Sequence, residues 1–296
     1  METVTSADGT VIAFDRHVGG ENGVVILIGG AFGFRRFPKM VQLAAALAEQ
    51  HRLTVINYDR RGRGDSTDSP GVYEVDREID DIAALVEAAG GAAALFGWSS
   101  GATLALRAAE SGRVKGITKV VAFEPPFVVD REGFVPQADL EMRLRELIAA
   151  DRRADTVRFY MTEAMGMPRV MVAAMRLTPF WKGLRATAPS TAHDWAVMRE
   201  FMRGEPLRTE DWSRVGVPTL VIAGGKSNAL LRKGAAPSPR YFPTPYSRRF
   251  PGSATTRTSG CSPPSPVRSS PVSSSTPSSG RLSRWGAHGR SRRPPR

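Results

Sequence analysis

Residues 92–111 of this chain read AAALFGWSSGATLALRAAES, and the order of residue types indicates a local structure. The apolar run at 92–96 lies between Gly90-Gly91 and a glycine-rich turn, which favours a strand over a helix. The stretch from 102 to 111, rich in Ala and Leu, is typical of a helix. A strand, a tight turn and a helix in this order are the repeating unit of a parallel sheet covered by helices.

The same alternation extends to both sides of this segment. Apolar runs at 24–28, 53–57 and 117–123 are expected to be strands. Stretches at 39–50 and 79–89 have the residue types of helices. The alternation predicts an α/β fold with a mostly parallel sheet flanked by helices.

A hairpin and a helical insertion complete the predicted architecture. Residues 3–16 form two alternating runs around Asp8-Gly9, which is a hairpin signal. Further along, residues 137–203 are almost entirely of helical type, and the strand pattern resumes at 218–223. A helical block between two sheet strands is expected to be an inserted cap, at about 130–210.

The composition changes after residue 227. Residues 228–296 contain 15 Ser, 12 Pro and 12 Arg and no acidic residue, so we predict a disordered tail that replaces the C-terminal part of the fold. The net charge of +12 belongs to this tail, because residues 1–227 hold 28 basic and 29 acidic side chains. The predicted division is therefore a domain at 1–227 and a tail at 228–296, and the near-neutral domain does not favour nucleic acid as a partner.

Cysteine content and apolar runs exclude further classes of protein. The single Cys261 excludes an internal disulfide framework and a cysteine-based zinc site. The sequence shows neither a secretory signal pattern nor an apolar run near the ~18–20 residues that span a bilayer. We therefore expect a cytoplasmic protein that does not enter a membrane.

Gly97–Gly101 (GWSSG) is the candidate catalytic turn. It matches the pattern G-x-S-x-G between a strand and a helix, and its two glycines permit a turn that lifts the Ser99 hydroxyl above the sheet edge. The Ser100 N–H can then face an oxyanion, and a second N–H is expected from Ala31 in the loop Gly29–Phe32. For both segments, the alternative is an ordinary glycine-rich turn between a strand and a helix.

Several stretches carry a resemblance to a known family. GWSSG at 97–101, GGAF at 29–32 and, above all, YDRRGRGDS at 58–66 resemble the α/β-hydrolase fold superfamily. FEPPF at 123–127 and VPTLVIAGGKS at 217–227 resemble a bacterial branch of it. The resemblance ends there and implies a serine hydrolase that acts on a small ester or related acyl substrate, with no cofactor or metal.

Charged residues of the YDRRGRGDS stretch have a structural interpretation. Asp59, Arg61 and Asp65 are expected to stabilise their own loop rather than to contact the substrate.

The acid partner of the serine departs from the family pattern. Many relatives have an aspartate after the strand that corresponds to 218–223, where this chain has GGKS at 224–227. Glu124, at the end of the preceding strand, is the candidate acid, which would orient a base imidazole. The alternative is that Glu124 only anchors the turn at Pro125-Pro126.

Histidine is the larger departure. In the family the base follows the acid, but His17 and His51 precede Ser99. His193 lies in the predicted cap, where a polar face or a substrate contact is expected. His288 has the right order but lies in the predicted tail. A serine hydroxyl without a base is a poor nucleophile near neutral pH, so we expect impaired activity.

The abrupt change at residue 228 leads to the hypothesis of a frameshift. The family fold continues with a helix, a strand, a histidine loop and a closing helix, whereas a GC-rich coding sequence read in the wrong frame has this Ser/Pro/Arg composition. Another frame of the same DNA should then encode those elements. If the tail is translated, the sheet lacks an edge strand, and we expect poor solubility.

Three functions are therefore compared. The first is a serine hydrolase with Ser99 and Glu124, a small-molecule substrate and a cap. The second is a catalytically inactive relative that binds a ligand, and the third is binding of nucleic acid or an acidic partner through the tail, against which its few aromatic residues argue. Met and aromatic side chains of the cap either wall an apolar pocket or pack against the sheet. They are Phe134, Met142, Phe159, Met161, Met165, Met167, Met171, Met175, Phe180 and Trp181.

Overall fold

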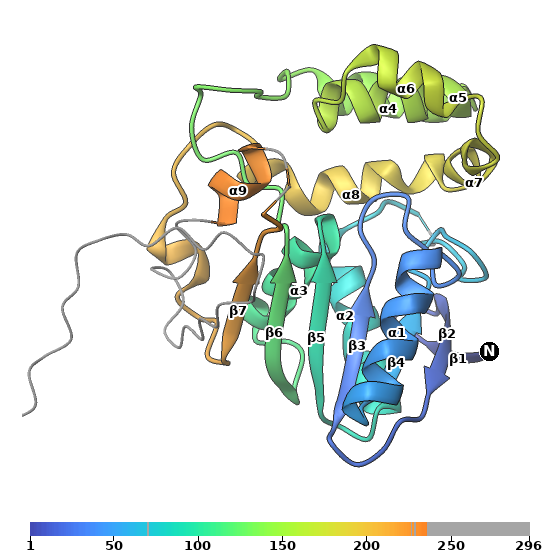
Figure 1. The fold of residues 1–296 in the computed structure, drawn as a ribbon, viewed down its shortest axis with the longest axis vertical. Coiled ribbons are helices and arrows are strands. Elements are labelled where there is room, and N and C mark those ends of the chain that lie inside the picture. Colours follow the sequence, from blue (N-terminus) through green and yellow to red (C-terminus); the bar gives the residue numbers. More distant parts are fainter. Residues whose placement is uncertain (70, 226, 228, 236–296) are drawn as a thin grey trace, which may run out of the picture. The chain divides into compact units, whose positions relative to one another are not determined.

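The sheet is the centre of the fold. A computed structural model describes residues 1–235, with gaps at 70, 226 and 228. Its seven-stranded sheet has the order β1-β2-β4-β3-β5-β6-β7 (Figure 1). β1 (Glu2–Thr5) and β2 (Val11–His17) form the expected hairpin, and β2 also pairs antiparallel with β4. The remaining pairings are parallel, which confirms the predicted mostly parallel sheet. The parallel strands are β3 (Val24–Ile28), β4 (Thr54–Tyr58), β5 (Ala93–Trp98), β6 (Ile117–Phe123) and β7 (Thr219–Ile222).

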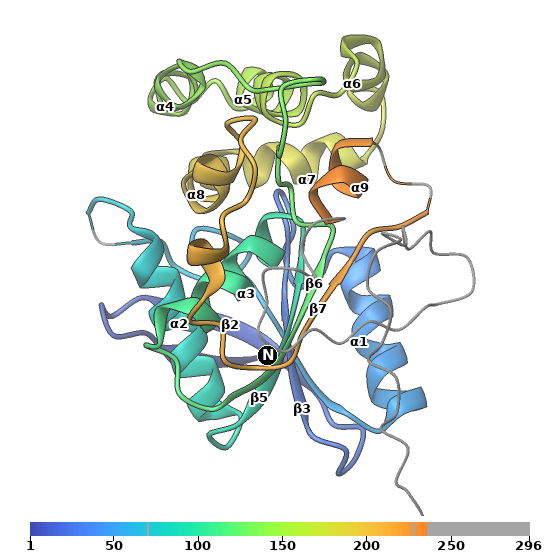
Figure 2. The same ribbon diagram turned by 90° about the vertical axis from the view of Figure 1, so that its left-hand side faces the viewer.

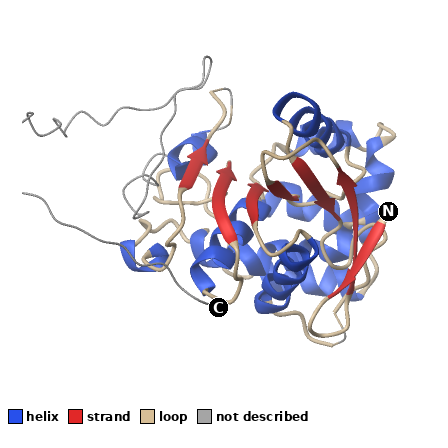
Figure 3. Ribbon diagram, turned by 90° about the horizontal axis from the view of Figure 1, so that it is seen from below, coloured by secondary structure: helices blue, strands red, loops and turns tan. Residues whose placement is uncertain are grey.

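Helices cover both faces of this sheet. α1 (Pro38–His51) lies on one face, and α2 (Val75–Ala88) and α3 (Ser100–Ser111) lie on the other (Figure 2). Figure 3 shows helices on both sides of the strands. Alternate residues of one strand point to opposite faces. In β3, Val25 packs in the cluster formed with α1, whereas Ile26 packs in the cluster formed with α2 and α3. Burial on both faces explains why the central strands are continuously apolar.

A series of helices lies between β6 and β7, where the sequence predicts a helical block. Figures 1 and 2 show these helices beyond the carboxyl ends of the strands. Their buried side chains form a second apolar cluster, which includes Leu144, Tyr160 and Trp195 and also Phe32 of the β3–α1 loop. The helices are α4 (Leu140–Ala149), α5 (Arg153–Phe159), α6 (Arg169–Met175), α7 (Phe180–Ala186) and α8 (Thr191–Met198), with short turns of other helix types at Tyr160–Ala164, Ala188–Ser190, Arg199–Phe201 and Thr209–Trp212.

α9 (Ala229–Ala235) corrects the predicted start of the tail. This helix falls within the segment that composition predicts to be disordered, because the average over 228–296 hides the helix-forming sequence ALLRKGA. Lys233 joins it to the core through ion pairs with Asp130 (2.9 Å) and Glu132 (3.0 Å). A disordered tail therefore does not begin at residue 228, and residues 236–296, with His288, lie outside the described residues.

The strand order brings two loops together at the carboxyl edge of the sheet. The chain leaves β3 toward β4 on one side and later returns to β5 on the other, so the ends of β3 and β5 are neighbours. Their register pairs Ile28 with Gly97. In open α/β sheets such a reversal of strand order is where ligands bind.

Two glycines of the turn after β5 permit its close packing. An added Cβ on Gly97 would lie 2.2 Å from the Gly101 carbonyl oxygen, and one on Gly101 would lie 2.3 Å from that of Ile28. Backbone atoms cannot yield at such distances without moving the helix or the strand. The turn between β5 and α3 therefore requires glycine at both positions.

We predict that Gly97→Ala lowers the free energy of unfolding by about 1–3 kcal/mol or more, because the added methyl overpacks the turn. Gly183→Ala is the matched control, since a Cβ there has no neighbour within 4 Å and the position is helical. The control should raise stability by up to about 1 kcal/mol. Urea denaturation measures both, and equal effects would contradict the packing argument.

Candidate functional site

Strained backbone gathers at the carboxyl edge of the sheet. Five described residues other than glycine have positive φ. Three of them follow neighbouring strands: Phe32 (φ 61°) after β3, Ser99 (φ 55°) after β5 and Glu124 (φ 54°) after β6. Each such conformation costs about 1–3 kcal/mol and persists where the surrounding structure enforces it, often at functional sites.

Ser99 occupies the turn between β5 and α3. Its φ of 55° and ψ of −121° place it at the N-cap of α3, and its N–H donates a hydrogen bond of 2.9 Å to the Phe123 carbonyl at the end of β6. The half-buried Ser99 side chain is followed at once by the wholly buried Ser100. The geometry is that of a sharp strand-to-helix turn, which the sequence pattern predicts.

The loop after β3 lies against this turn. An added Cβ on Gly30 would be 3.0 Å from the Cβ of Ser99 and 2.7 Å from the Trp98 carbonyl oxygen. Within the described residues, the backbone N–H groups of Ala31 and Ser100 donate no hydrogen bond to other backbone groups. Two backbone donors are thus free on segments that touch beside Ser99.

Glu124 directly follows the next strand, β6. Its N–H donates to the Ile222 carbonyl at 2.7 Å, and its carboxylate accepts hydrogen bonds from the Gly224 N–H (3.2 Å) and from the Ser227 hydroxyl. The carboxylate therefore holds the loop that follows β7. This contact joins the GGKS segment to the residue predicted as the acid.

None of the three described histidines forms a hydrogen bond with the Ser99 hydroxyl. His17 is in β2 and His51 ends α1. His193, in α8, stacks on Tyr73 with ring centroids 4.0 Å apart. The structure therefore does not bring a histidine to Ser99 within residues 1–235.

Three residues of the YDRRGRGDS segment, which are predicted to stabilise their own loop, bind both within it and to neighbouring segments. Asp59 accepts hydrogen bonds from the backbone N–H of Arg35 (2.7 Å) and of Asp65 (2.9 Å), and Asp65 also pairs with the Arg35 side chain. Arg61 forms an ion pair of 2.6 Å with Asp81. These contacts are structural.

Two other arginines of this segment were missed by sequence reasoning. Arg60 and Arg63 are wholly buried and both contact Asp194 of α8, at 2.7 and 2.5 Å. Arg60 also pairs with Glu78 at 2.6 Å. The sequence does mark the arginines, through their place in a charged motif, but nothing near Asp194 indicates its partners.

Electrostatics keep this buried cluster ionised. Burial alone would raise the pKa of Asp194, but Arg63 and Arg60 outweigh it and hold that pKa below its ordinary value. Burial opposes ionisation of Glu78 in the same way, and Arg60 lowers its pKa to about 2. Two cations and two anions therefore balance inside the protein.

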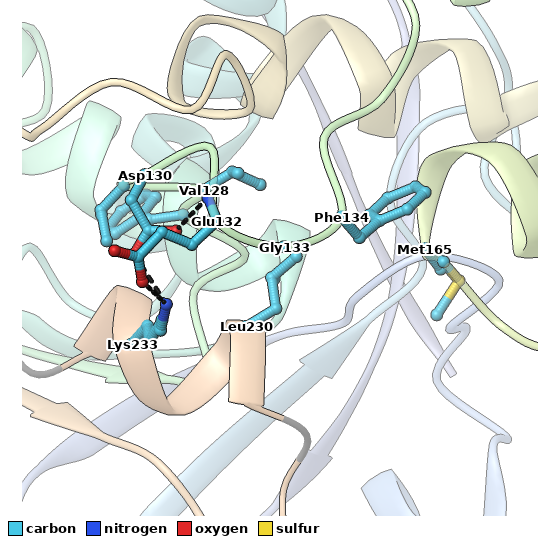
Figure 4. A pocket seen from close by; sticks show the side chains of 11 residues that line it. Val128, Asp130, Glu132, Gly133, Phe134, Met165, Leu230 and Lys233 are labelled. Atoms are coloured by element: carbon cyan, nitrogen blue, oxygen red, sulfur yellow. Dashed lines mark hydrogen bonds and ion pairs between the residues drawn. The ribbon is translucent and has the colours of Figure 1, made fainter.

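A cavity of about 330 Å³ lies between the segment after β6 and α9. In Figure 4, Phe134 and Met165 lie on one side of it, and Lys233 points to Asp130 and Glu132 on the other. These three charged side chains pair with one another, and the remaining lining residues are uncharged. The cavity is therefore largely apolar, apart from one ionic group in which two carboxylates share one ammonium.

Half of the ten Met and aromatic residues singled out in the helical block pack internally. Phe159, Met161 and Trp181 are buried in its apolar cluster, and Met167 and Met175 pack against that cluster. Exposed members of the set are Met142, Met165, Met171 and Phe180. Of the ten residues, Phe134 and Met165 line the cavity.

These features agree with a comparison to known families. The model of the alpha/beta hydrolase family matches residues 25–262, which is well over half of the chain. The chain therefore belongs to the alpha/beta hydrolase family, and the resemblance found in the sequence is confirmed. The matched range ends inside the segment that composition sets apart.

Solved structures give the same fold. An alpha/beta hydrolase from Sphaerobacter thermophilus is 43% identical, with a TM-score of 0.74 over 83% of this chain and 90% of that chain. A hydrolase from Pseudomonas aeruginosa is 20% identical (TM-score 0.59; 82% and 87% covered). An esterase from Exiguobacterium antarcticum is 18% identical (TM-score 0.56; 85% and 91% covered), and these two similarities concern the fold alone. A search of curated proteins found no match to this chain.

Two negative findings concern residues 1–235 outside the gaps. No helix there is long and apolar enough to cross a membrane. The same residues contain no group of three or more His, Cys, Asp and Glu side chains placed to hold a metal ion.

His193 makes stability depend on pH. Burial lowers its pKa in the folded protein, assisted by Arg63 and Arg60 and opposed by Asp68 and Glu78. Below about pH 6.5, His193 therefore binds a proton in the unfolded chain but stays neutral in the folded protein. The free energy of unfolding falls as the pH drops through this range.

We predict that the free energy of unfolding decreases from pH 6.5 toward about pH 5, and that His193→Gln removes up to about 1.4 kcal/mol per pH unit of that slope. Urea denaturation across the range measures it. His51→Gln, at the exposed end of α1, is the matched control. An unchanged slope in His193→Gln would contradict the assignment.

Proposed function

We propose that this chain is a serine hydrolase that cleaves a small ester or related acyl substrate, with Ser99 as the nucleophile. The observation that carries the proposal is the strained Ser99 turn (φ 55°, ψ −121°) between β5 and α3, in contact with the glycine loop after β3. Membership of the alpha/beta hydrolase family supports hydrolysis as the class of reaction. The proposed hydrolysis needs no cofactor. The cytoplasmic location stays a prediction of the sequence.

In the proposed reaction the Ser99 oxygen attacks the carbonyl carbon of the ester. The carbonyl oxygen becomes an oxyanion, which the backbone N–H groups of Ala31 and Ser100 stabilise. Collapse of this intermediate expels the alcohol and leaves an acyl group on Ser99. Water then attacks the acyl carbon, which releases the acid and restores the hydroxyl.

The proton of the Ser99 hydroxyl needs an acceptor. Glu124 is the proposed acid that would orient an imidazole, although its described contacts are with the loop after β7. His17, His51 and His193 do not serve as the base from their positions in the described structure. Proton removal is therefore the weak step of the proposed reaction.

We predict Ser99-dependent turnover of an activated ester such as p-nitrophenyl butyrate, which is accelerated by free imidazole. Imidazole supplies the base from solution, and the acceleration should reach at most about 10²-fold, since a positioned base contributes about 10²–10⁴-fold. Ser99→Ala should abolish both the basal turnover and the acceleration. Steady-state absorbance at several imidazole concentrations measures them.

Ser99→Ala is also the control for ester cleavage by imidazole itself. Turnover that is equal in wild type and Ser99→Ala would contradict the nucleophile assignment. It would favour a catalytically inactive, ligand-binding relative. His288→Ala tests the remaining histidine: a loss of basal turnover would identify a base outside the described residues.

The cavity after β6 is proposed to hold the apolar part of the substrate beneath a cap formed by α4–α8. Its segment begins three residues after Glu124, so it belongs to the same edge of the sheet as Ser99. Pairing of Lys233 with Asp130 and Glu132 leaves no net attraction for an anionic substrate. A neutral ester with an aliphatic chain fits this lining best.

We predict that Phe134→Ala shifts the preference toward longer acyl chains, because removing the ring enlarges the cavity. The ratio of kcat/KM for octanoyl over butyryl esters should rise about tenfold, in line with about 1–3 kcal/mol per unmatched methylene group. Phe180→Ala, an exposed aromatic position that does not line the cavity, is the matched control. An unchanged ratio in Phe134→Ala would place the acyl chain elsewhere.

A further inference from the structure

We propose that Asp194 of α8 is a positioning residue, which holds both segments that carry the oxyanion donors. The inference rests on the proposed function, because it concerns the same site. Asp194 need not touch the substrate. It acts through Ser100, Arg63 and Arg60. The orientation of the two backbone donors therefore depends on α8, a helix outside the sheet.

The first contact is with Ser100. The Asp194 carboxylate accepts a hydrogen bond of 2.7 Å from the Ser100 hydroxyl, and both residues are wholly buried. Ser100 is the first residue of α3, and its own backbone N–H is one of the two donors. Holding its side chain fixes the first turn of α3, and with it the direction of that N–H next to Ser99.

The second contact leads to the other donor. Arg63 donates to Asp194 at 2.5 Å and, through its other terminal nitrogen, to the carbonyl oxygens of Gly30 (2.8 Å) and Gly33 (3.1 Å). In a trans peptide the carbonyl and the following N–H point in opposite directions. Because Arg63 donates a hydrogen bond to the Gly30 carbonyl, the Ala31 N–H points away from the guanidinium.

Arg60 adds a third contact to the same loop. It donates to Asp194 at 2.7 Å and to the Gly29 carbonyl at 3.3 Å, while Glu78 binds its remaining nitrogens at 2.6 and 2.7 Å. Glu78 alone therefore neutralises Arg60 when Asp194 is changed. Among the described residues, Arg63 has Asp194 as its single carboxylate partner.

A residue that only fastened α8 to the sheet could contact any part of the core. Each polar contact of the Asp194 carboxylate instead reaches the turn at Ser99–Ser100 or the loop at 29–33, directly or through one arginine. These are the two segments that touch beside the nucleophile. The same arginines also bind Glu78 and Ser190. The pattern of contacts points to positioning of the donors.

The test compares Asp194→Asn with Asp81→Asn. Asp81 is the matched control because it is equally buried and pairs with Arg61 of the same motif, at 2.6 and 2.8 Å, but does not contact the loop at 29–33. Two quantities are measured. They are kcat and KM for p-nitrophenyl butyrate, and amide hydrogen exchange at Gly33, whose N–H donates to the Gly30 carbonyl at 2.9 Å.

Asp194→Asn should lower kcat by about 10²-fold, the effect of losing one oxyanion donor, with KM changed less than about threefold. Exchange at Gly33 should rise by about tenfold as the loop opens more often. Asp81→Asn should change neither quantity, although both variants lower the melting temperature. This contrast is what a merely structural role for Asp194 would not produce.

Two outcomes separate this inference from the proposed function. Equal losses of kcat in both variants, with exchange at Gly33 unchanged, would overturn the positioning role. If wild type lacks Ser99-dependent turnover but exchange rises in Asp194→Asn alone, the positioning of the loop is supported and the proposed function fails.

Ser100→Ala covers the case in which Asp194→Asn does not fold. It removes the 2.7 Å contact with Asp194 without leaving an unpaired charge. A fall in kcat of about tenfold or more supports the inference, because a hydrogen bond to a carboxylate contributes at least about that factor. An unchanged kcat in the folded Ser100→Ala variant overturns it.

Discussion

Two buried guanidinium groups, of Arg60 and Arg63, are the constraint on which the arrangement at the sheet edge depends. A cation removed from water must be paired and hydrogen-bonded, because an unpartnered buried charge is strongly destabilising. The partners here are Glu78 of α2, Asp194 of α8 and carbonyl oxygens of the loop at 29–33. Arg60 and Arg63 come from one loop, and their hydrogen-bond and ion-pair partners come from three segments that are far apart in the sequence. Pairing the two buried charges thus brings these segments together.

The strained backbone of the edge fits this constraint. Positive φ at Phe32, Ser99 and Glu124 is unfavourable in an isolated chain and has to be enforced by neighbours. Strand pairing holds two of them, since the Ser99 and Glu124 N–H groups each donate to the end of the adjacent strand. The Phe32 ring is held by an edge-on contact with Tyr160 of the helical block. Contacts from both the sheet and the inserted helices therefore hold the carboxyl edge of the sheet in this conformation.

Local patterns predicted the elements well, because their signals are local. Continuous apolar runs between glycines located β3 to β7 to within about two residues, and G-x-S-x-G located the turn at Ser99. Helix starts were predicted less exactly. The helix expected at 79–89 begins at Val75, because its first turn is mostly polar and carries no apolar periodicity. Asp194 could not be predicted as a partner of Ser100, because 94 positions separate them and its neighbours give no sign of the contact. α9 was missed because a composition taken over 69 residues hides a helix of seven.

Among the described residues, the contacts that hold the proposed nucleophile and oxyanion donors involve no histidine, and this separates the formation of the site from the supply of a base. The Ser99 turn is held by Gly97, Gly101 and the end of β6, and the donor loop by Arg60 and Arg63. None of these contacts needs a histidine. Because a nucleophile without its base loses most of its reactivity, the rate of the proposed reaction depends on the proton acceptor as much as on the geometry of the turn and the donors.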